Sequence, residues 1–176
     1  MTEPHCPPVI KWCRHICGVC LSIGILVALA ILGLVSYSLV FSETVVQDQP
    51  LTVERARQIG CPIPLPETAT NVRFAIYRHW GEHDVYVKFK DDSTVCRNWA
   101  DTAVSAYATE NHEKAPKVEL QRVTTAPATP SWGGVGPLRW FNIERIVDGA
   151  TWSGGHDEPT IWVDDDHDLF FYRVTN

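Results

Sequence analysis

Hydrophobic positions along the chain follow two contrasting patterns, one continuous and one alternating. The continuous pattern is an apolar run at residues 16–41, and no charged side chain lies between Arg14 and Glu43. A helix of about 20 apolar residues crosses the hydrocarbon core of a bilayer, at about 1.5 Å of rise per residue. The run therefore predicts one transmembrane helix over residues 16–41.

The alternating pattern occupies residues 71–79 and 84–90. Apolar side chains occur at every second position of both segments: Val72, Phe74, Ile76, Val85, Val87 and Phe89. A period of two with one polar face is typical of antiparallel strands that cover a core on one side only. We therefore expect a β-hairpin with its loop at residues 80–83, and an outer face that carries Tyr86 and Lys88.

Helical signals lie on either side of this hairpin. Thr52 is a suitable N-cap for a short helix at residues 53–59, which Gly60 would end. Asp92 or Ser93 would start a longer helix, in which side chains recur at helical spacing: Cys96, Ala100, Ala103 and Tyr107. We expect this longer helix to lie across the hairpin.

The remaining segments complete the prediction of the fold class. Residues 117–123 are predicted as an edge strand and residues 139–147 as a short helix. The C-terminal part is predicted as three strands separated by turns, at residues 150–153, 160–163 and 169–174. The main elements follow the order β-β-α-loop-α-β-β-β. The sequence therefore predicts an α+β fold, in which a single N-terminal transmembrane helix precedes a small antiparallel-sheet domain.

Charged residues on either side of the apolar run predict the orientation of the chain. Lys11 and Arg14 precede the run, whereas acidic residues follow it. Because Lys and Arg are retained on the cytoplasmic side of a membrane, we expect the N-terminus inside the cell and the C-terminal domain outside. The predicted parts are a cytoplasmic head at 1–15, a transmembrane helix in membrane lipid at 16–41, a stalk at 42–51 and an extracytoplasmic α+β domain at 52–176.

A cleaved signal peptide is the alternative to this signal anchor. The apolar region of a signal peptide spans only about 7–15 residues. Ala28 and Ala30 fit the small residues of a cleavage site, but the apolar run continues well beyond them. We therefore expect an uncleaved, single-pass anchor in the cell membrane.

The predicted membrane helix divides the six cysteines into two groups. Cys61 and Cys96 lie on the outer side, where an oxidising compartment favours a disulfide between them. The alternative for this pair is two unpaired, buried thiols. The other four lie in the head and at the start of the apolar run: Cys6, Cys13, Cys17 and Cys20. For these four, the sequence leaves open packing as small residues, reversible acylation and zinc binding.

Composition and charge narrow the classes of function. Of the 176 residues, 45% are hydrophobic and 20% are charged, and the formal net charge is −6. The apolar and aromatic content excludes a disordered chain, and a single apolar run excludes a polytopic channel or transporter. An acidic chain lacks the basic surface that nucleic acid binding requires, so no nucleic acid partner is expected.

Two short patterns contain residue types that bind metals. His79, Glu82 and His83 match the H-x-x-E-H string of a class of zinc proteases. That chemistry needs the two histidines on one face of a helix, whereas this string lies in the predicted hairpin. A metal-dependent hydrolase that uses His79, His83 and nearby carboxylates is the alternative function. Alternate aspartates at residues 164–168 match the start of a calcium loop, but its later glycine and glutamate are missing.

The main candidate site is a surface of aromatic and basic side chains on the hairpin. Arg and aromatic residues are typical of the energetic centres of interfaces. Five such residues form the predicted binding surface: Tyr77, Arg78, Trp80, Tyr86 and Lys88. Arg73 and Lys90 would extend it as a basic strip. We expect no catalytic residue, metal or cofactor, so the predicted function is a binding or assembly module for an envelope protein or a polymer.

Three strings in the outer region carry a resemblance to known proteins. They are PLPETATNV at residues 64–72, IWVD at 161–164 and FFY at 170–172, and the aromatic hairpin accompanies them. In these strings the chain resembles a group of small, uncharacterised bacterial membrane-anchored proteins that have an α+β extracytoplasmic domain and no assigned activity. The resemblance implies the same compartment and fold, and it implies no site residue.

Overall fold

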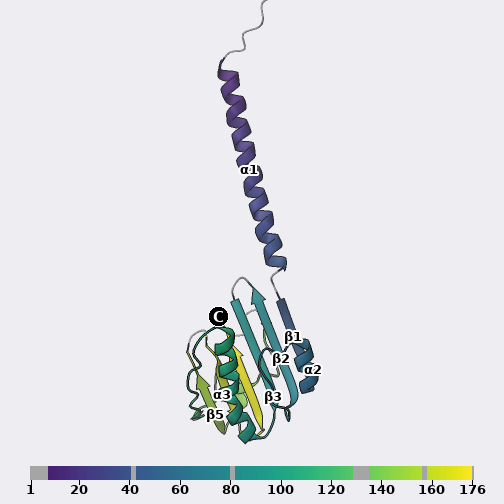
Figure 1. Cartoon of the computed structure of the whole chain (residues 1–176), viewed down its shortest axis with the longest axis vertical. Helices are drawn as coiled ribbons and strands as arrows, with labels where there is room; N and C mark the ends of the chain where they lie inside the picture. The colour runs from purple at the N-terminus through teal and green to yellow at the C-terminus, as the bar shows by residue number, and fades with distance from the viewer. Residues whose placement is uncertain (1–7, 41–42, 80–81, 129–134, 156–157, 176) are drawn as a thin grey trace, which may run out of the picture. The chain divides into compact units, whose positions relative to one another are not determined.

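The structure is a computed structural model that describes residues 8–40, 43–79, 82–128, 135–155 and 158–175 (Figure 1). The chain divides into two compact units, Met1–Phe41 and Ser42–Asn176. Within the first unit, side chains are described only from Cys20 to Ser36. The side chains of the predicted head at 1–15, and the cysteines at 6, 13 and 17, therefore lie outside the described part.

The first unit contains a single described element, the helix α1 (Pro8–Val40). Its described side chains are all exposed, and they include large hydrophobic residues such as Leu21, at 67% exposed, and Leu26, at 66%. Among the helices in the described residues, none is both long enough and apolar enough to cross a membrane.

The second unit is built on one antiparallel sheet, which confirms the predicted α+β fold class (Figure 1). Seven strands are present in the described residues, in the spatial order β1-β2-β3-β7-β6-β5-β4. Their bounds are β1 (Glu43–Leu51), β2 (Thr70–His79), β3 (Glu82–Lys90), β4 (Gln121–Arg122), β5 (Gly149–Ser153), β6 (Thr160–Asp164) and β7 (Leu169–Val174). The alternating sequence segments therefore form the β2–β3 hairpin, and the three C-terminal strands form the predicted meander.

The prediction of a separate stalk at 42–51 is wrong, because residues 43–51 form the edge strand β1 of the sheet. Its register pairs Val45 with Ile76 and Gln47 with Phe74 on β2. Val45 and Leu51 are partly buried against the core, which explains why this segment joins the sheet despite its polar composition. An edge strand buries little of its surface, so its residues need not show a regular alternation.

Both ends of α2 and the start of α3 lie at the predicted residues. The Thr52 side chain accepts a hydrogen bond from the Arg55 N–H at 3.3 Å at the start of α2 (Val53–Ile59), and Gly60 ends this helix with a φ of 93°. Asp92 caps α3 (Ser93–Glu110) by accepting from the Thr94 N–H at 2.8 Å. The predicted helix at 139–147 is reduced to a single 3-10 turn, η2 (Ile143–Arg145).

One face of the sheet carries the first hydrophobic core, which α2 and α3 cover. Its buried residues come from both helices and from the inward positions of the strands, and they include Ala56, Val72, Phe74, Phe89, Cys96, Val104, Ile161 and Phe170. Phe89 and Phe170 stack at 4.7 Å between ring centroids. The helix α3 lies over β6 and β7, rather than across the β2–β3 hairpin as predicted (Figure 1).

The opposite face of the sheet carries a second hydrophobic core, although a polar outer face was predicted. Strand residues contribute Ala75, Tyr86, Trp162 and Phe171, and the segment 135–146 covers them with Leu138, Trp140, Phe141, Ile143 and Ile146. We call residues 135–146 the cover segment. Because this segment lies on the outer face, both faces of the sheet are packed in the described part of the domain.

Candidate functional site

The structure does not bring the predicted binding surface together. Tyr86 is fully buried in the second core, and Lys88 is half-buried beside it. Arg78 is exposed but lies on the opposite face of the sheet from its neighbour Tyr77, because successive strand residues point to opposite faces. Trp80 lies outside the described residues. The four described residues are therefore distributed over two faces and do not form one surface.

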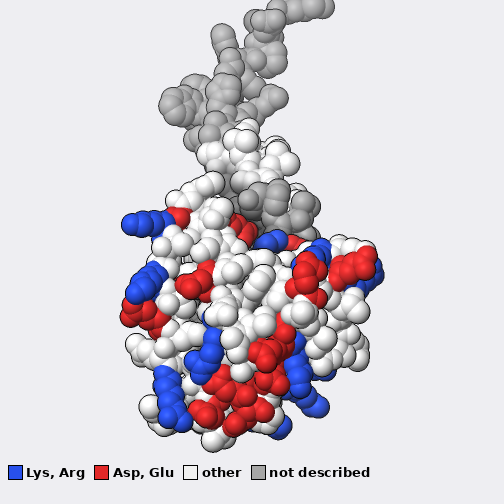
Figure 2. Space-filling view, turned by 60° about the horizontal axis from the view of Figure 1, so that its bottom comes forward, with Lys and Arg blue, Asp and Glu red and all other residues white. Residues whose placement is uncertain are grey.

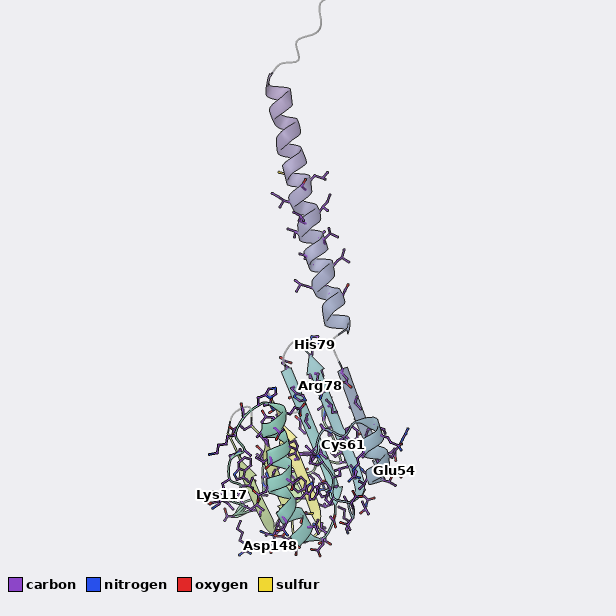
Figure 3. The ribbon with its side chains drawn as sticks, in the orientation of Figure 1. Glu54, Cys61, Arg78, His79, Lys117 and Asp148 are labelled. Atoms are coloured by element: carbon purple, nitrogen blue, oxygen red, sulfur yellow. The ribbon has the colours of Figure 1, made fainter. Side chains whose placement is uncertain are left out.

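The two histidines of the H-x-x-E-H string are also separated by the sheet. In the hairpin register His79 pairs with Glu82, and His83 pairs with Arg78, so the histidines point to opposite faces. Arg78 Nε lies 3.4 Å from His83 Nε2, and Figure 3 shows Arg78 and His79 at the end of β2. Burial, together with the nearby Arg78, lowers the pKa of His83. Neither histidine is placed to share a metal ion with the other, so the zinc-protease pattern has no structural counterpart.

Carboxylates gather at one end of the sheet, where the β6–β7 turn meets the start of α3. The Asp91 N–H donates to the Asp168 carbonyl at 3.0 Å, and Figure 2 shows acidic side chains concentrated on this end. Asp164 is buried, and its carboxylate accepts from the His167 N–H at 3.2 Å and contacts His167 Nδ1 at 2.9 Å. Across the described residues, no group of three or more His, Cys, Asp or Glu side chains is arranged to hold a metal ion.

The predicted disulfide between Cys61 and Cys96 is not formed, and both residues are free thiols. Cys96 is fully buried, and its Sγ donates to the Asp91 carbonyl at 3.4 Å. Cys61 is half-buried against the first core, after the end of α2 (Figure 3). Burial raises the pKa of Cys61 to about 11 and that of Cys96 to about 12. Both thiols therefore stay protonated and weakly nucleophilic near neutral pH.

Lys88 is a half-buried charged group beside the second core. Its Nζ donates to the Trp140 carbonyl and to Asn142 Oδ1, both at 2.9 Å, and lies 4.9 Å from the centre of the Phe171 ring. These contacts join β3 and β7 to the cover segment. Lys88 therefore acts as a tether between the sheet and the segment that covers its outer face.

The surroundings of Lys88 favour its neutral form. Burial lowers the pKa of Lys88 to about 8, and repulsion from Arg73 and Arg145 adds to the effect, while Asp164 and Glu144 oppose it. Arg73 is the residue directly opposite Lys88 in the hairpin register. Two cations therefore face each other across neighbouring strands, an arrangement that destabilises a sheet unless another group compensates it.

Phe141 is the centre of the second core. Among the described residues, its ring meets four aromatic rings edge-on: Tyr86 at 5.3 Å, Phe171 at 5.4 Å, Trp140 at 5.9 Å and Trp162 at 6.1 Å between centroids. Edge-to-face packing of this kind adds to the stabilisation from burial. The position of Phe141 fixes the cover segment on the sheet and places Trp140 beside β1.

A surface pocket of ≈ 390 Å³ lies where the cover segment meets strands β1 and β2. Its lining residues come from three parts of the chain: Asp48 on β1, Arg73 on β2, and Pro137, Arg139 and Trp140 on the cover segment. Trp140 Nε1 donates to Asp48 Oδ1 at 2.9 Å, which closes one wall of the pocket. We call this the basic pocket, because two guanidinium groups face one carboxylate in it.

A larger pocket, of ≈ 540 Å³, lies beside α2 but is less suited to a charged ligand. Arg57 and Glu67 both line it, and they form an ion pair with each other at 2.8 Å. Glu54 also lines it, at the start of α2, and its Oε1 accepts a hydrogen bond from Gln58 Nε2 at 3.4 Å. The arginine of this pocket is therefore already paired with a carboxylate, in contrast to those of the basic pocket.

Sequence reasoning identified part of the basic pocket. Arg73 belongs to the predicted basic strip, whereas Lys88 of the predicted binding surface pairs with Arg73 in the sheet and does not line the pocket. Arg139 and Trp140 were assigned only to a short helix, and Asp48 to the stalk, since no local pattern shows that these segments meet. Comparisons of the chain with known protein families, with curated proteins and with solved structures found no match.

Proposed function

We propose that this protein is a single-pass, membrane-anchored module that binds a ligand on its extracytoplasmic domain. The observation that carries the proposal is the apolar surface of α1. Leu21, Leu26 and Leu32 on that helix are each more than 60% exposed. Apolar surface left in water is unfavourable by about 25 cal/mol per Å², so these side chains favour a lipid environment.

The charge pattern supports a defined orientation for this anchor. Lys11 and Arg14 precede the apolar run at 16–41, and Glu43 is the first charged residue after it. The positive-inside rule then assigns residues 1–15 to the cytoplasm and residues 42–176 to the outside. In this proposal the anchor contacts membrane lipid, and the domain meets its ligand in the envelope.

A binding role is supported by the way the domain is built. Its first core is formed by both described helices of the domain and the sheet, and its second core by the sheet and the cover segment. The basic pocket lies at the edge of the second core. It contains Arg73 and Arg139, which form no ion pair within the described residues. A rigid scaffold that presents such groups is typical of a binding protein.

Membrane retention tests the anchor directly. Val27 lies in the middle of the apolar run, and Val27→Lys would place a charge there at a cost of about 2.5–3.5 kcal/mol on the insertion scale. We expect the unmodified chain and the matched control Val27→Ala to remain in the membrane after a carbonate wash, and Val27→Lys to be partly released. Recovery of the unmodified chain in the washed supernatant would contradict the proposal.

Protease treatment of intact cells tests the orientation. We expect an added protease to degrade the domain, which contains Trp162, while a tag fused before Lys11 survives. Loss of the tag with an intact domain would reverse the predicted topology. The same preparation, sequenced from its N-terminus, separates an uncleaved anchor from a processed one.

A further inference from the structure

We infer that the basic pocket binds a small ligand through a single oxyanion group, a carboxylate or a phosphate, held by Arg73 and Arg139. The inference deepens the proposed function and rests on it, because it names the ligand class of a binding module. The relevant groups come from strands β1 and β2 and from the cover segment, which the second core holds in place.

Arg73 and Arg139 differ in their partners from several other arginines of the domain. Among the described residues, carboxylates pair with Arg57 (Glu67), Arg78 (Glu43), Arg97 (Asp165) and Arg122 (Asp148), whereas Arg55 donates to Gln58. Within the part of the chain that the structure describes, neither Arg73 nor Arg139 has a hydrogen-bond or ion-pair partner. In a chain of net charge −6, arginines find carboxylates readily. Two unpaired guanidinium groups in one pocket therefore indicate a site for an external anion.

Asp48 and Lys88 are the other charged residues beside Arg73 and Arg139. Asp48 is the carboxylate that lines it, and its Oδ1 already accepts the Trp140 Nε1 proton at 2.9 Å. Lys88 lies opposite Arg73 on the neighbouring strand and adds positive charge behind the pocket. An anion between the guanidinium groups would reduce the repulsion between Arg73 and Lys88.

The volume and lining of the basic pocket limit the size and chemistry of its ligand. A volume of ≈ 390 Å³ is that of a small-molecule site, and Pro137 and Trp140 offer apolar surface for the rest of the ligand. The planar fork of an arginine matches carboxylate and phosphate oxygens in bidentate geometry. Asp48 would repel a second negative group, so the pocket favours a ligand with one oxyanion over a polyanion.

Calorimetric titration of the full-length chain in detergent micelles tests the inference. The probes are inorganic phosphate and acetate, which separate the two oxyanion types and each carry a single oxyanion group. We expect saturable binding of at least one probe, weakened by about tenfold or more in Arg73→Gln and in Arg139→Gln, since each removes a charge-assisted hydrogen-bond donor. The matched control is Arg55→Gln, because Arg55 is an exposed arginine on α2 outside this pocket and should leave affinity unchanged.

A second measurement keeps the test independent of folding. Arg73→Lys retains the positive charge but loses the planar guanidinium group that binds an oxyanion in bidentate geometry. We expect this variant to bind the probes more weakly than the unmodified chain and more strongly than Arg73→Gln. Circular dichroism of every variant checks that the fold is retained. Absence of binding by both probes, or equal binding by the unmodified chain and both Gln variants, would overturn the inference. Either result would leave membrane retention intact, whereas release from the membrane would overturn the proposed anchor instead.

Discussion

Truncation of Phe141 is the sharpest test of the second core. This side chain is fully buried and meets four aromatic rings at 5.3–6.1 Å. Replacing a buried Phe by Ala removes the transfer free energy of the ring and leaves a cavity, at a cost of about 3–5 kcal/mol. A domain of this size is stable by about 5–15 kcal/mol in total, so Phe141→Ala should remove a large part of its stability.

The effect should be local as well as global. Backbone hydrogen bonds within the cover segment, such as Phe141 N–H to the Leu138 carbonyl at 2.9 Å, depend on packing against the sheet. We expect hydrogen exchange in Phe141→Ala to show loss of protection across the cover segment, while amides in α3 remain the slower-exchanging group. Urea unfolding of the full chain in detergent gives the change in the free energy of unfolding.

Two controls make this prediction decisive. Val147 follows the cover segment and is 81% exposed, so Val147→Ala should change stability by no more than about 0.5 kcal/mol. Phe74 is fully buried in the first core, and Phe74→Ala should lower stability by a similar amount to Phe141→Ala without selective exposure of the cover segment. A loss below about 1 kcal/mol in Phe141→Ala, with protection retained, would refute the second core.

Three further predictions follow from individual contacts. Lys88 has a pKa of about 8 in the fold and about 10.5 when unfolded, so the unfolded chain binds more protons between these values. Urea unfolding should therefore show the unmodified chain gaining about 1–3 kcal/mol relative to Lys88→Met as pH rises through this window, and a flat difference would contradict the burial of Lys88. A β-carbon on Gly149 would overlap the Val163 carbonyl oxygen, so Gly149→Ala should cost about 1–3 kcal/mol, and an unchanged urea midpoint would exclude that contact. Because Cys61 and Cys96 are free, a reductant should leave the melting temperature unchanged, whereas loss of a disulfide would remove about 3–4 kcal/mol.

Local signals in the sequence predicted most of the elements of the domain. Thr52 and Gly60 determine both ends of α2, because a cap hydroxyl and a left-handed terminal residue act over a few positions. The β2–β3 hairpin follows from the alternation of apolar residues along both strands, and β7 from a short apolar and aromatic run after a turn. These parts of the fold depend on neighbours in the chain, so the sequence alone was sufficient.

The covering of the outer face could not be predicted in the same way. The cover segment has no periodic pattern, and its contact with Tyr86 and Phe171 is made over long separations in the chain. The side chains of Tyr86 and Lys88 have polar ends and were therefore expected in solvent, although Tyr86 is fully buried and the amino group of Lys88 bonds to the cover segment. In contrast, the separation of His79 from His83 was available from the hairpin itself, since His79 pairs with Glu82 across the turn and the next residue, His83, points to the other face.

The basic pocket shows how the second core and the inferred ligand site depend on each other. Arg139 and Trp140 lie on the cover segment next to Phe141, so the pocket exists only while that segment is packed on the sheet. A ligand that binds the packed state alone must stabilise it, by an amount that grows with ligand concentration. Saturating phosphate or acetate should therefore slow hydrogen exchange in the cover segment of the unmodified chain and leave exchange unchanged in Arg73→Gln. Equal slowing in both proteins would show that the anion acts elsewhere, and the connection between packing and binding would then be lost.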